Sequence, residues 1–79
     1  MPTIRFLDGV KIEIFYRDHP PPHLHASIAE YELLVNIKDG TVYEGRLPKR
    51  LQRKVIDYVN DSGNNKDLMR LWQEYSKVS

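Results

Sequence analysis

The stretch His19-Pro20-Pro21-Pro22-His23-Leu24-His25 divides the chain into segments of different pattern. It contains all three histidines and three of the five prolines. Proline has no backbone N–H to donate to a strand ladder, so the prolines predict that one strand ends before them and another begins at His23. The stretch therefore indicates a corner between two strands, and it is where we expect the functional residues.

Before this corner the sequence alternates with a period of two. Val10, Ile12 and Ile14 are apolar and are separated by residues of other types. This alternation predicts a half-buried strand. Asp8-Gly9, just upstream, is typical of a two-residue hairpin turn, which would follow a short segment over residues 3–7.

After the corner the alternation continues. Leu24, Ala26 and Ile28 are the apolar members of the first strand, and a tight turn near Ala29-Glu30 leads to a second strand over residues 31–37.

Asp39-Gly40 is the strongest local turn signal in the chain, because a two-residue loop with positive φ favours this pair. It predicts that Lys38 pairs with Thr41 and Ile37 with Val42. A short fifth strand would follow this turn.

The pattern changes to a helical period from Pro48, a residue that suits the first turn of a helix. Residues 60–65 form a break rich in Asn, Ser and Gly, after which Asn64 or Asn65 could cap a second helix. The apolar stripes of the two helices would be Leu51, Val55, Tyr58 and Val59, and then Leu68, Leu71, Trp72 and Tyr75.

These patterns predict one α+β domain over residues 1–79. An antiparallel sheet of four to five strands (about 3–45) would be followed by two C-terminal helices (about 48–60 and 65–77) packed on one face. The residues expected under the helices are Val10, Ile12, Ile14, Leu24, Ala26, Ile28, Leu33, Val35 and Ile37. The residues expected on the uncovered face are Lys11, Glu13, Phe15, Arg17, His23, His25, Ser27, Glu32 and Leu34.

The composition excludes several classes of protein. The chain has no cysteine, and therefore no disulfide framework or thiolate chemistry. It has neither a secretory signal pattern nor an apolar run of about 20 residues. We therefore expect a cytoplasmic protein without membrane contact.

The net charge is only +1, but basic residues are concentrated locally. Residues 46–54 contain five Lys or Arg and no Asp or Glu. Such a stripe can bind phosphate groups or an acidic partner, or it can be a solvated helix face. Its members are Arg46, Lys49, Arg50, Arg53 and Lys54.

The histidines allow a metal site. His23 and His25 are two residues apart on a strand, so their side chains leave the same face and could bind one divalent ion. The third ligand would be His19 or a carboxylate from Asp18 or Glu30. A straight polyproline segment would place His19 and His23 roughly 12 Å apart, so His19 could join only if the segment bends. Between a bound divalent metal and no cofactor, we expect no cofactor.

Two other interpretations use the same face. His23 and His25 could act as acid and base in a metal-independent ribonuclease-type reaction, with Arg17 binding the phosphate. Phe15, Leu34 or Tyr43 could instead stack on bases or form the centre of a protein interface. Hydrogen-bonded histidines with a purely structural role are the third possibility.

Several short motifs occur here in one order, namely Met1–Ile4, Tyr16–His19, Pro21–Ala26, Glu30-Tyr31, Asp39-Gly40, Glu44–Pro48 and Leu71-Trp72. With these motifs the chain resembles the bacterial domain-of-unknown-function 4160 family over nearly its whole length. Pro20 stands where the family more often has asparagine.

The resemblance implies a small protein partner encoded nearby, as in a toxin–antitoxin-like pair, with RNA or DNA as a further possible partner. It implies no catalytic residue. The leading hypothesis is an interaction module that contacts a partner protein or nucleic acid through the histidine face and the basic helix. The expected binding residues are Phe15, Arg17, Arg46, Lys49, Arg50 and Arg53.

Overall fold

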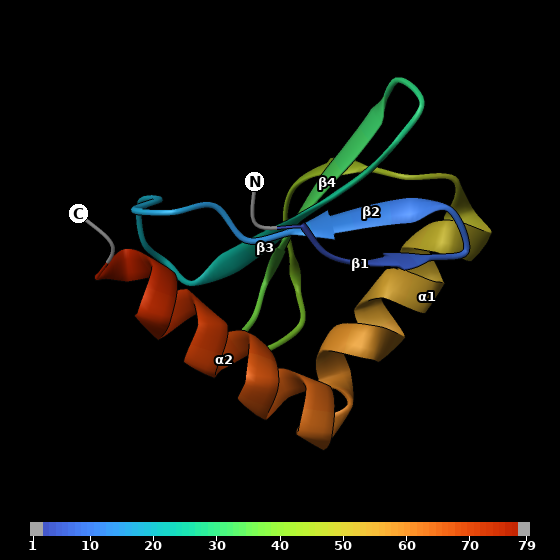
Figure 1. The fold of residues 1–79 in the computed structure, drawn as a ribbon. Coiled ribbons are helices and arrows are strands. Elements are labelled where there is room, and N and C mark those ends of the chain that lie inside the picture. Colours follow the sequence, from blue (N-terminus) through green and yellow to red (C-terminus); the bar gives the residue numbers. More distant parts are fainter. Residues whose placement is uncertain (1–2, 78–79) are drawn as a thin grey trace.

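Five strands are followed by two helices in the computed structural model, which describes residues 3–77 (Figure 1). The predicted α+β fold is confirmed, and the sheet contains five strands within the described residues. The elements are β1 (Thr3–Leu7), β2 (Val10–Glu13), β3 (His23–Ile28), β4 (Tyr31–Asn36), β5 (Val42–Arg46), α1 (Lys49–Asn60) and α2 (Ser62–Ser76).

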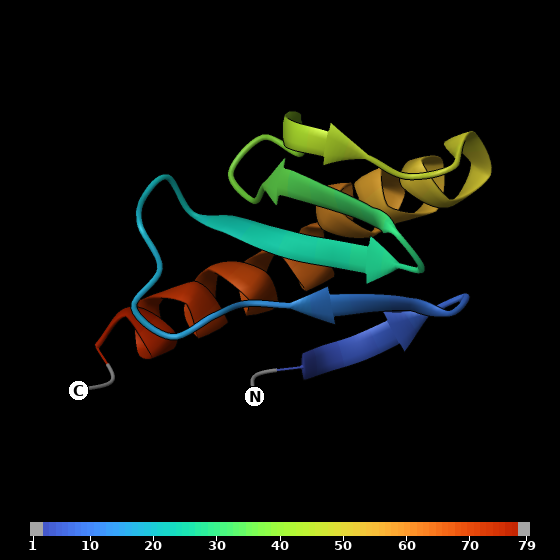
Figure 2. The ribbon, with the colours of Figure 1, turned by 90° about the horizontal axis from the view of Figure 1, so that it is seen from above.

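Each strand pairs in antiparallel fashion with its neighbour in the sequence, so the sheet order is β1-β2-β3-β4-β5 (Figure 2). The turn at Asp8-Gly9 is confirmed as a two-residue hairpin loop between Leu7 and Val10. Both loop residues have positive φ, 49° and 84°, as the type I′ turn requires. The turn at Ala29-Glu30 is confirmed as well, because Ile28 and Tyr31 are paired across it.

The predicted register of the β4–β5 hairpin is wrong. Val42 pairs with Val35 rather than with Ile37, and the register shifts between Leu34 and Val35. Strand β4 ends early because the Ile37 backbone is engaged elsewhere: its N–H donates to the Pro22 carbonyl at 3.0 Å. Four residues therefore separate Asn36 from Thr41, whose carbonyl accepts the Asn36 N–H at 2.8 Å.

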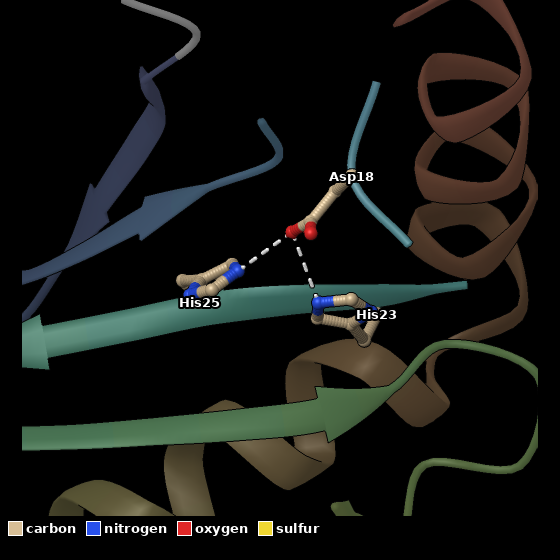
Figure 3. A group of neighbouring side chains, drawn as sticks. All are labelled: Asp18, His23 and His25. Carbon is tan, nitrogen blue, oxygen red and sulfur yellow. Dashed lines mark hydrogen bonds and ion pairs between the residues drawn. The ribbon is translucent and has the colours of Figure 1, made fainter. Parts of the chain in front are cut away.

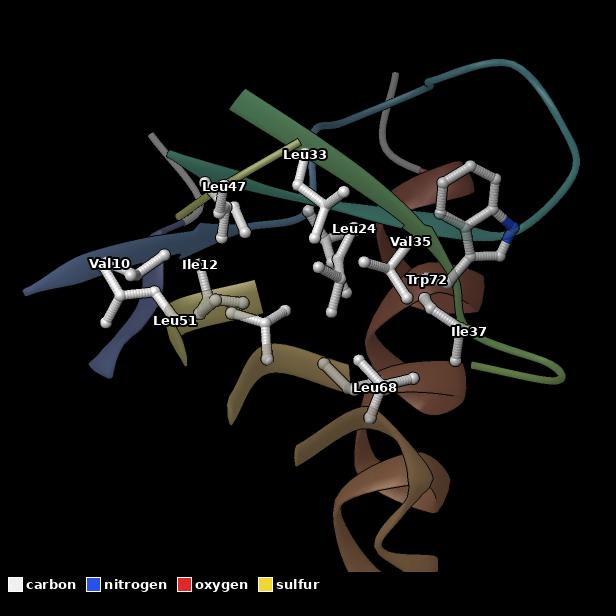
Figure 4. Packing of buried hydrophobic residues seen from close by; sticks show 14 residues of the cluster. Val10, Ile12, Leu24, Leu33, Val35, Ile37, Leu47, Leu51, Leu68 and Trp72 are labelled. Carbon is white, nitrogen blue, oxygen red and sulfur yellow. The ribbon is translucent and has the colours of Figure 1, made fainter. Parts of the chain in front are cut away.

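Both helices cover the same face of the sheet (Figure 1), and the core lies between these two layers (Figure 4). The strand residues predicted under the helices are buried, apart from Ile28, which is half-buried. From the helices, the buried side chains are Leu51, Val55, Val59, Leu68 and Trp72. Burying one such side chain stabilises the fold by about 1.5–3 kcal/mol. Neither helix is long and apolar enough to cross a membrane, within the residues described.

The predicted start of the second helix is wrong by three residues. Helix α2 begins at Ser62, and its N-cap is Asp61, whose carboxylate accepts the Asn64 N–H at 3.0 Å. Asn64 and Asn65 are not caps; their side chains donate to the carbonyls of Tyr58 and Val59 at the end of α1. The polar residues of the break thus form the first turn of α2 and join it to α1.

Residues 14–22, which we call the proline loop, connect β2 to β3 beside the C-terminal end of α2 (Figure 2). The Arg17 N–H donates to the Tyr75 carbonyl at 3.1 Å, and the Tyr16 ring packs edge-on against the Tyr75 ring. The peptide bond between Pro20 and Pro21 is cis. The loop is therefore attached to the helix layer as well as to the sheet.

Candidate functional site

The histidine pair does not lie on an open sheet face, which corrects the sequence-based expectation. The His23 side chain has no exposed surface, and only 15% of the His25 side chain is exposed. Phe15 from the proline loop packs edge-on against His25, with ring centroids 4.4 Å apart. On the helix side, the Trp72 ring lies 5.2 Å from the His23 ring. The alternation pattern missed this burial because it contains no information about where a loop runs.

The carboxylate of Asp18 lies between the two imidazoles (Figure 3). Its Oδ2 atom is 3.0 Å from His25 Nε2 and 3.1 Å from His23 Nε2. Its Oδ1 atom accepts the backbone N–H of His19 at 2.8 Å. Partial burial raises the pKa of Asp18, but the hydrogen bonds from His25 and His19 and the charges of His23 and His25 outweigh burial, so the pKa lies below its ordinary value.

The opposite nitrogen of each ring contacts an acceptor. His23 Nδ1 is 2.6 Å from the Pro21 carbonyl oxygen, and His25 Nδ1 is 3.2 Å from a carboxylate oxygen of Glu32. Carbonyl and carboxylate oxygens accept hydrogen bonds, so His23 donates from Nδ1 to Pro21, and its Nε2 lone pair then points towards Asp18 when the ring is neutral. Both ring nitrogens of His25 face carboxylate oxygens, so His25 donates from one of them when neutral and from both when protonated.

The two Nε2 atoms differ in their hydrogen bonding. His25 Nε2 is hydrogen-bonded to Asp18 Oδ2. His23 Nε2 is equally close to that oxygen but outside hydrogen-bond geometry, so it has no hydrogen-bond partner among the described residues. A fully buried, unpartnered ring nitrogen is rare in folded proteins.

The metal candidates named from the sequence separate into two groups. The ligand atoms of Asp18, His23 and His25 all lie within 4.8 Å of one another. His19 lies close by, with its ring centroid 5.1 Å from that of His23, but its side chain is 64% exposed and outside this group. Glu30 is exposed in the β3–β4 turn.

Glu32, the carboxylate beside His25, was placed on the same sheet face from the sequence but was not named as a site residue. It could have been found from the strand register, because Glu32 pairs with Ser27, two residues along β3 from His25. Diagonal neighbours of this kind lie on the same face of a sheet.

The basic stripe divides into two sets. Lys54 and Arg50 point towards Asp8 in the β1–β2 turn, at 3.0 and 3.7 Å. The other three, Arg46, Lys49 and Arg53, are exposed and form no ion pair with a described residue.

These three cations surround a surface depression that we call the basic hollow. Arg50 lines the hollow as well, and the rest of the lining consists of Tyr31, Leu47, Pro48, Gln52, Ile56 and one carboxylate, Asp57. Most of its lining comes from the end of β5 and from α1, and the junction of these elements lies at the opposite end of the sheet from the proline loop (Figure 2). Arg17 is exposed on that loop, so it does not contribute to the hollow.

Comparisons with known proteins give one result. A family model described as a domain of unknown function (DUF4160) matches residues 9–73 of the chain. A search of curated proteins and a search of solved structures each found no match.

Proposed function

The chain belongs to the DUF4160 family, a domain of unknown function, and from its surface chemistry we propose that it is an interaction module that binds single-stranded nucleic acid at the basic hollow. One observation carries this proposal. Arg46, Lys49 and Arg53 line the hollow and form no ion pair with a described carboxylate. Arg50 also lines it, 3.7 Å from Asp8, whereas Lys54 pairs with Asp8 outside the lining.

The lining of the hollow favours nucleic acid over a simple anion. Arginine binds phosphate through its planar fork, and the half-buried ring of Tyr31 offers a surface on which a base can stack. Apolar atoms of Pro48 and Ile56 extend the contact beyond charge. A single strand fits best because its bases are free to stack, whereas those of a duplex are not.

The histidines contribute less to this proposal than the sequence suggested. His23 has no exposed surface, so it cannot touch a macromolecule in this conformation. The ribonuclease-type alternative needs His23 and His25 as an acid–base pair, and burial of His23 weighs against it. The contact surface therefore consists of the basic hollow alone.

Binding of a fluorescent single-stranded oligonucleotide, followed by anisotropy, tests the proposal. We expect binding at low salt that weakens as salt rises. Three phosphate contacts on a single strand correspond to a slope of about −2 for log K against log salt concentration. Arg46→Ala and Arg53→Ala should each weaken binding several-fold and reduce this slope by about 0.7.

Lys54→Ala is the matched control, because it removes one positive charge from the same helix at a residue that pairs with Asp8 and does not line the hollow. It should weaken binding less than Arg53→Ala does. If both variants lost the same affinity, binding would depend on the overall positive charge and not on the hollow. If no oligonucleotide binds at low salt, the proposal is wrong, and an acidic protein partner of the toxin–antitoxin-like kind becomes the occupant to test.

A further inference from the structure

We infer that Asp18, His23 and His25 form a binding site for one divalent transition-metal ion, of which Zn²⁺ is the best-fitting example. The ligand atoms would be Asp18 Oδ2, His23 Nε2 and His25 Nε2. The site is separate from the basic hollow and does not depend on nucleic-acid binding.

Three potential ligand atoms are crowded together. The Nε2 atoms of His23 and His25 lie within 3.1 Å of the same carboxylate oxygen, Asp18 Oδ2. The Nδ1 atoms of both rings face other acceptors, the Pro21 carbonyl and the Glu32 carboxylate. A ring that donates from Nδ1 alone presents its Nε2 lone pair to Asp18, and a cation among the three atoms removes this repulsion.

A proton alone does not satisfy the cluster. Protonated His25 can donate to Asp18, with which its Nε2 is hydrogen-bonded. His23 Nε2 would still be buried without a hydrogen bond to any described residue. A cation held by all three atoms would satisfy them at once, so the orphaned nitrogen is the observation that favours a metal.

The ligand types and spacing also fit. Two imidazoles and one carboxylate are typical of zinc and of other divalent transition metals. Ligands about 2.1 Å from one Zn²⁺ ion in tetrahedral geometry lie about 3.4 Å apart. The separations of 3.0 and 3.1 Å from Asp18 Oδ2 to the two nitrogens are shorter by a few tenths of an ångström, so a small outward shift of the side chains admits the ion.

The surroundings support the ligands in the way that metal sites require. Metal-binding histidines usually donate their second N–H to a carbonyl or carboxylate, which fixes the ring orientation. Here the Pro21 carbonyl does so for His23, and the Glu32 carboxylate does so for His25. Asp18 is oriented by the N–H of His19.

Calorimetric titration of the full chain with Zn²⁺ at pH 7.5, after treatment with EDTA and dialysis, tests the inference. We expect uptake of one ion per chain. Asp18→Asn and His25→Gln keep the side-chain shape approximately, and each should weaken binding at least tenfold. His19→Gln is the matched control, because His19 is the exposed histidine outside the group, and it should leave the affinity unchanged.

Histidine NMR provides a second readout that needs no variant. Zn²⁺ should shift the Nε2 resonances of His23 and His25 and leave those of His19 nearly unchanged. This measurement decides the question if a substitution unfolds the chain. Absence of uptake of Zn²⁺, Mn²⁺, Co²⁺ or Ni²⁺ would overturn the inference. So would an equal loss of affinity in His19→Gln and His25→Gln, which would indicate adventitious binding to surface histidines.

Discussion

At the scale of single residues, Gly45 shows how closely β4 and β5 approach where Gly45 pairs with Leu33. Its φ is +80°, a region that side-chain-bearing residues rarely adopt. A Cβ atom there would also collide with the backbone carbonyl oxygen of Glu32 on the neighbouring strand. Backbone cannot move aside as the end of a flexible side chain can, so this position requires glycine.

Gly45→Ala should therefore lower the free energy of unfolding by about 1–3 kcal/mol, measured by urea denaturation. Gly63→Ala is the control, because Gly63 lies in the first turn of α2, where a Cβ would meet only Asp61 at 3.4 Å. Alanine favours a helix by up to about 1 kcal/mol over glycine, so this variant should be no less stable than the wild type. Equal destabilisation of both variants would contradict the argument.

For the histidines, the sequence predicted the direction of the side chains but not their contacts. Strand alternation correctly indicated that His23 and His25 leave the same side of β3, since both reach one oxygen of Asp18. From the sequence, Asp18 was one of three alternatives for the third metal ligand, beside His19 and Glu30. Its contact with His25 depends on how the proline loop runs, which is set by distant partners such as the Tyr75 carbonyl.

At the scale of elements, the β1–β2 hairpin is attached to α1 by charge. Asp8 lies in the hairpin turn, and Lys54 and Arg50 approach it from one face of the helix. The hydrogen bond and charge of Lys54 lower the pKa of Asp8. A carboxyl with a lowered pKa in the folded state stabilises the fold above its unfolded pKa, and this contribution is lost as the pH falls through the lowered pKa.

Lys54→Gln should return the Asp8 pKa towards its ordinary value, and Arg50→Gln should do so less, because the Lys54 contacts contribute most to the shift. Carboxyl ¹³C chemical shifts, followed from pH 7 to pH 2, measure both changes. Added salt should reduce the difference between the wild type and Lys54→Gln, because exposed charges are screened. If the Asp8 pKa changed more in Arg50→Gln than in Lys54→Gln, Arg50 rather than Lys54 would be the main partner of Asp8, and the argument would be wrong.

Local pattern predicted the elements and the turns at Asp8-Gly9 and Ala29-Glu30 correctly, but it failed at two other junctions. Period-two and helical stripes identified the strands, the helices and their buried faces. The β4–β5 register failed because the turn signal at Asp39-Gly40 competes with tertiary bonds to Ile37. The start of α2 failed because Asn64 and Asn65 were interpreted as caps, although their side chains bind carbonyls of the preceding helix.

At the scale of the whole molecule, Asn65 connects three elements. Its side-chain amide donates to the Val59 carbonyl at the end of α1 and to the Ile37 carbonyl beyond the end of β4. The residue itself is in the first turn of α2. One amide group thus holds both helices and the sheet together at the corner where they meet.

Asn65→Ala should lower the free energy of unfolding by about 1–3 kcal/mol, because it leaves two partly buried carbonyls without this donor. Thermal or urea denaturation followed by circular dichroism measures the loss. Lys66→Ala, at the next and exposed position, should change stability by no more than about 0.5 kcal/mol. A stable Asn65→Ala protein would show that packing alone holds the corner.

The strand order has a consequence for the time course of synthesis. Every strand pairs with its neighbour in the sequence, so each hairpin can form as soon as its second strand has been made. Both helices are made later than all five strands. Until they dock, the apolar underside of the sheet has no cover, and such transiently exposed surfaces promote aggregation. The nascent sheet therefore depends on the two helices that follow it to cover this apolar surface.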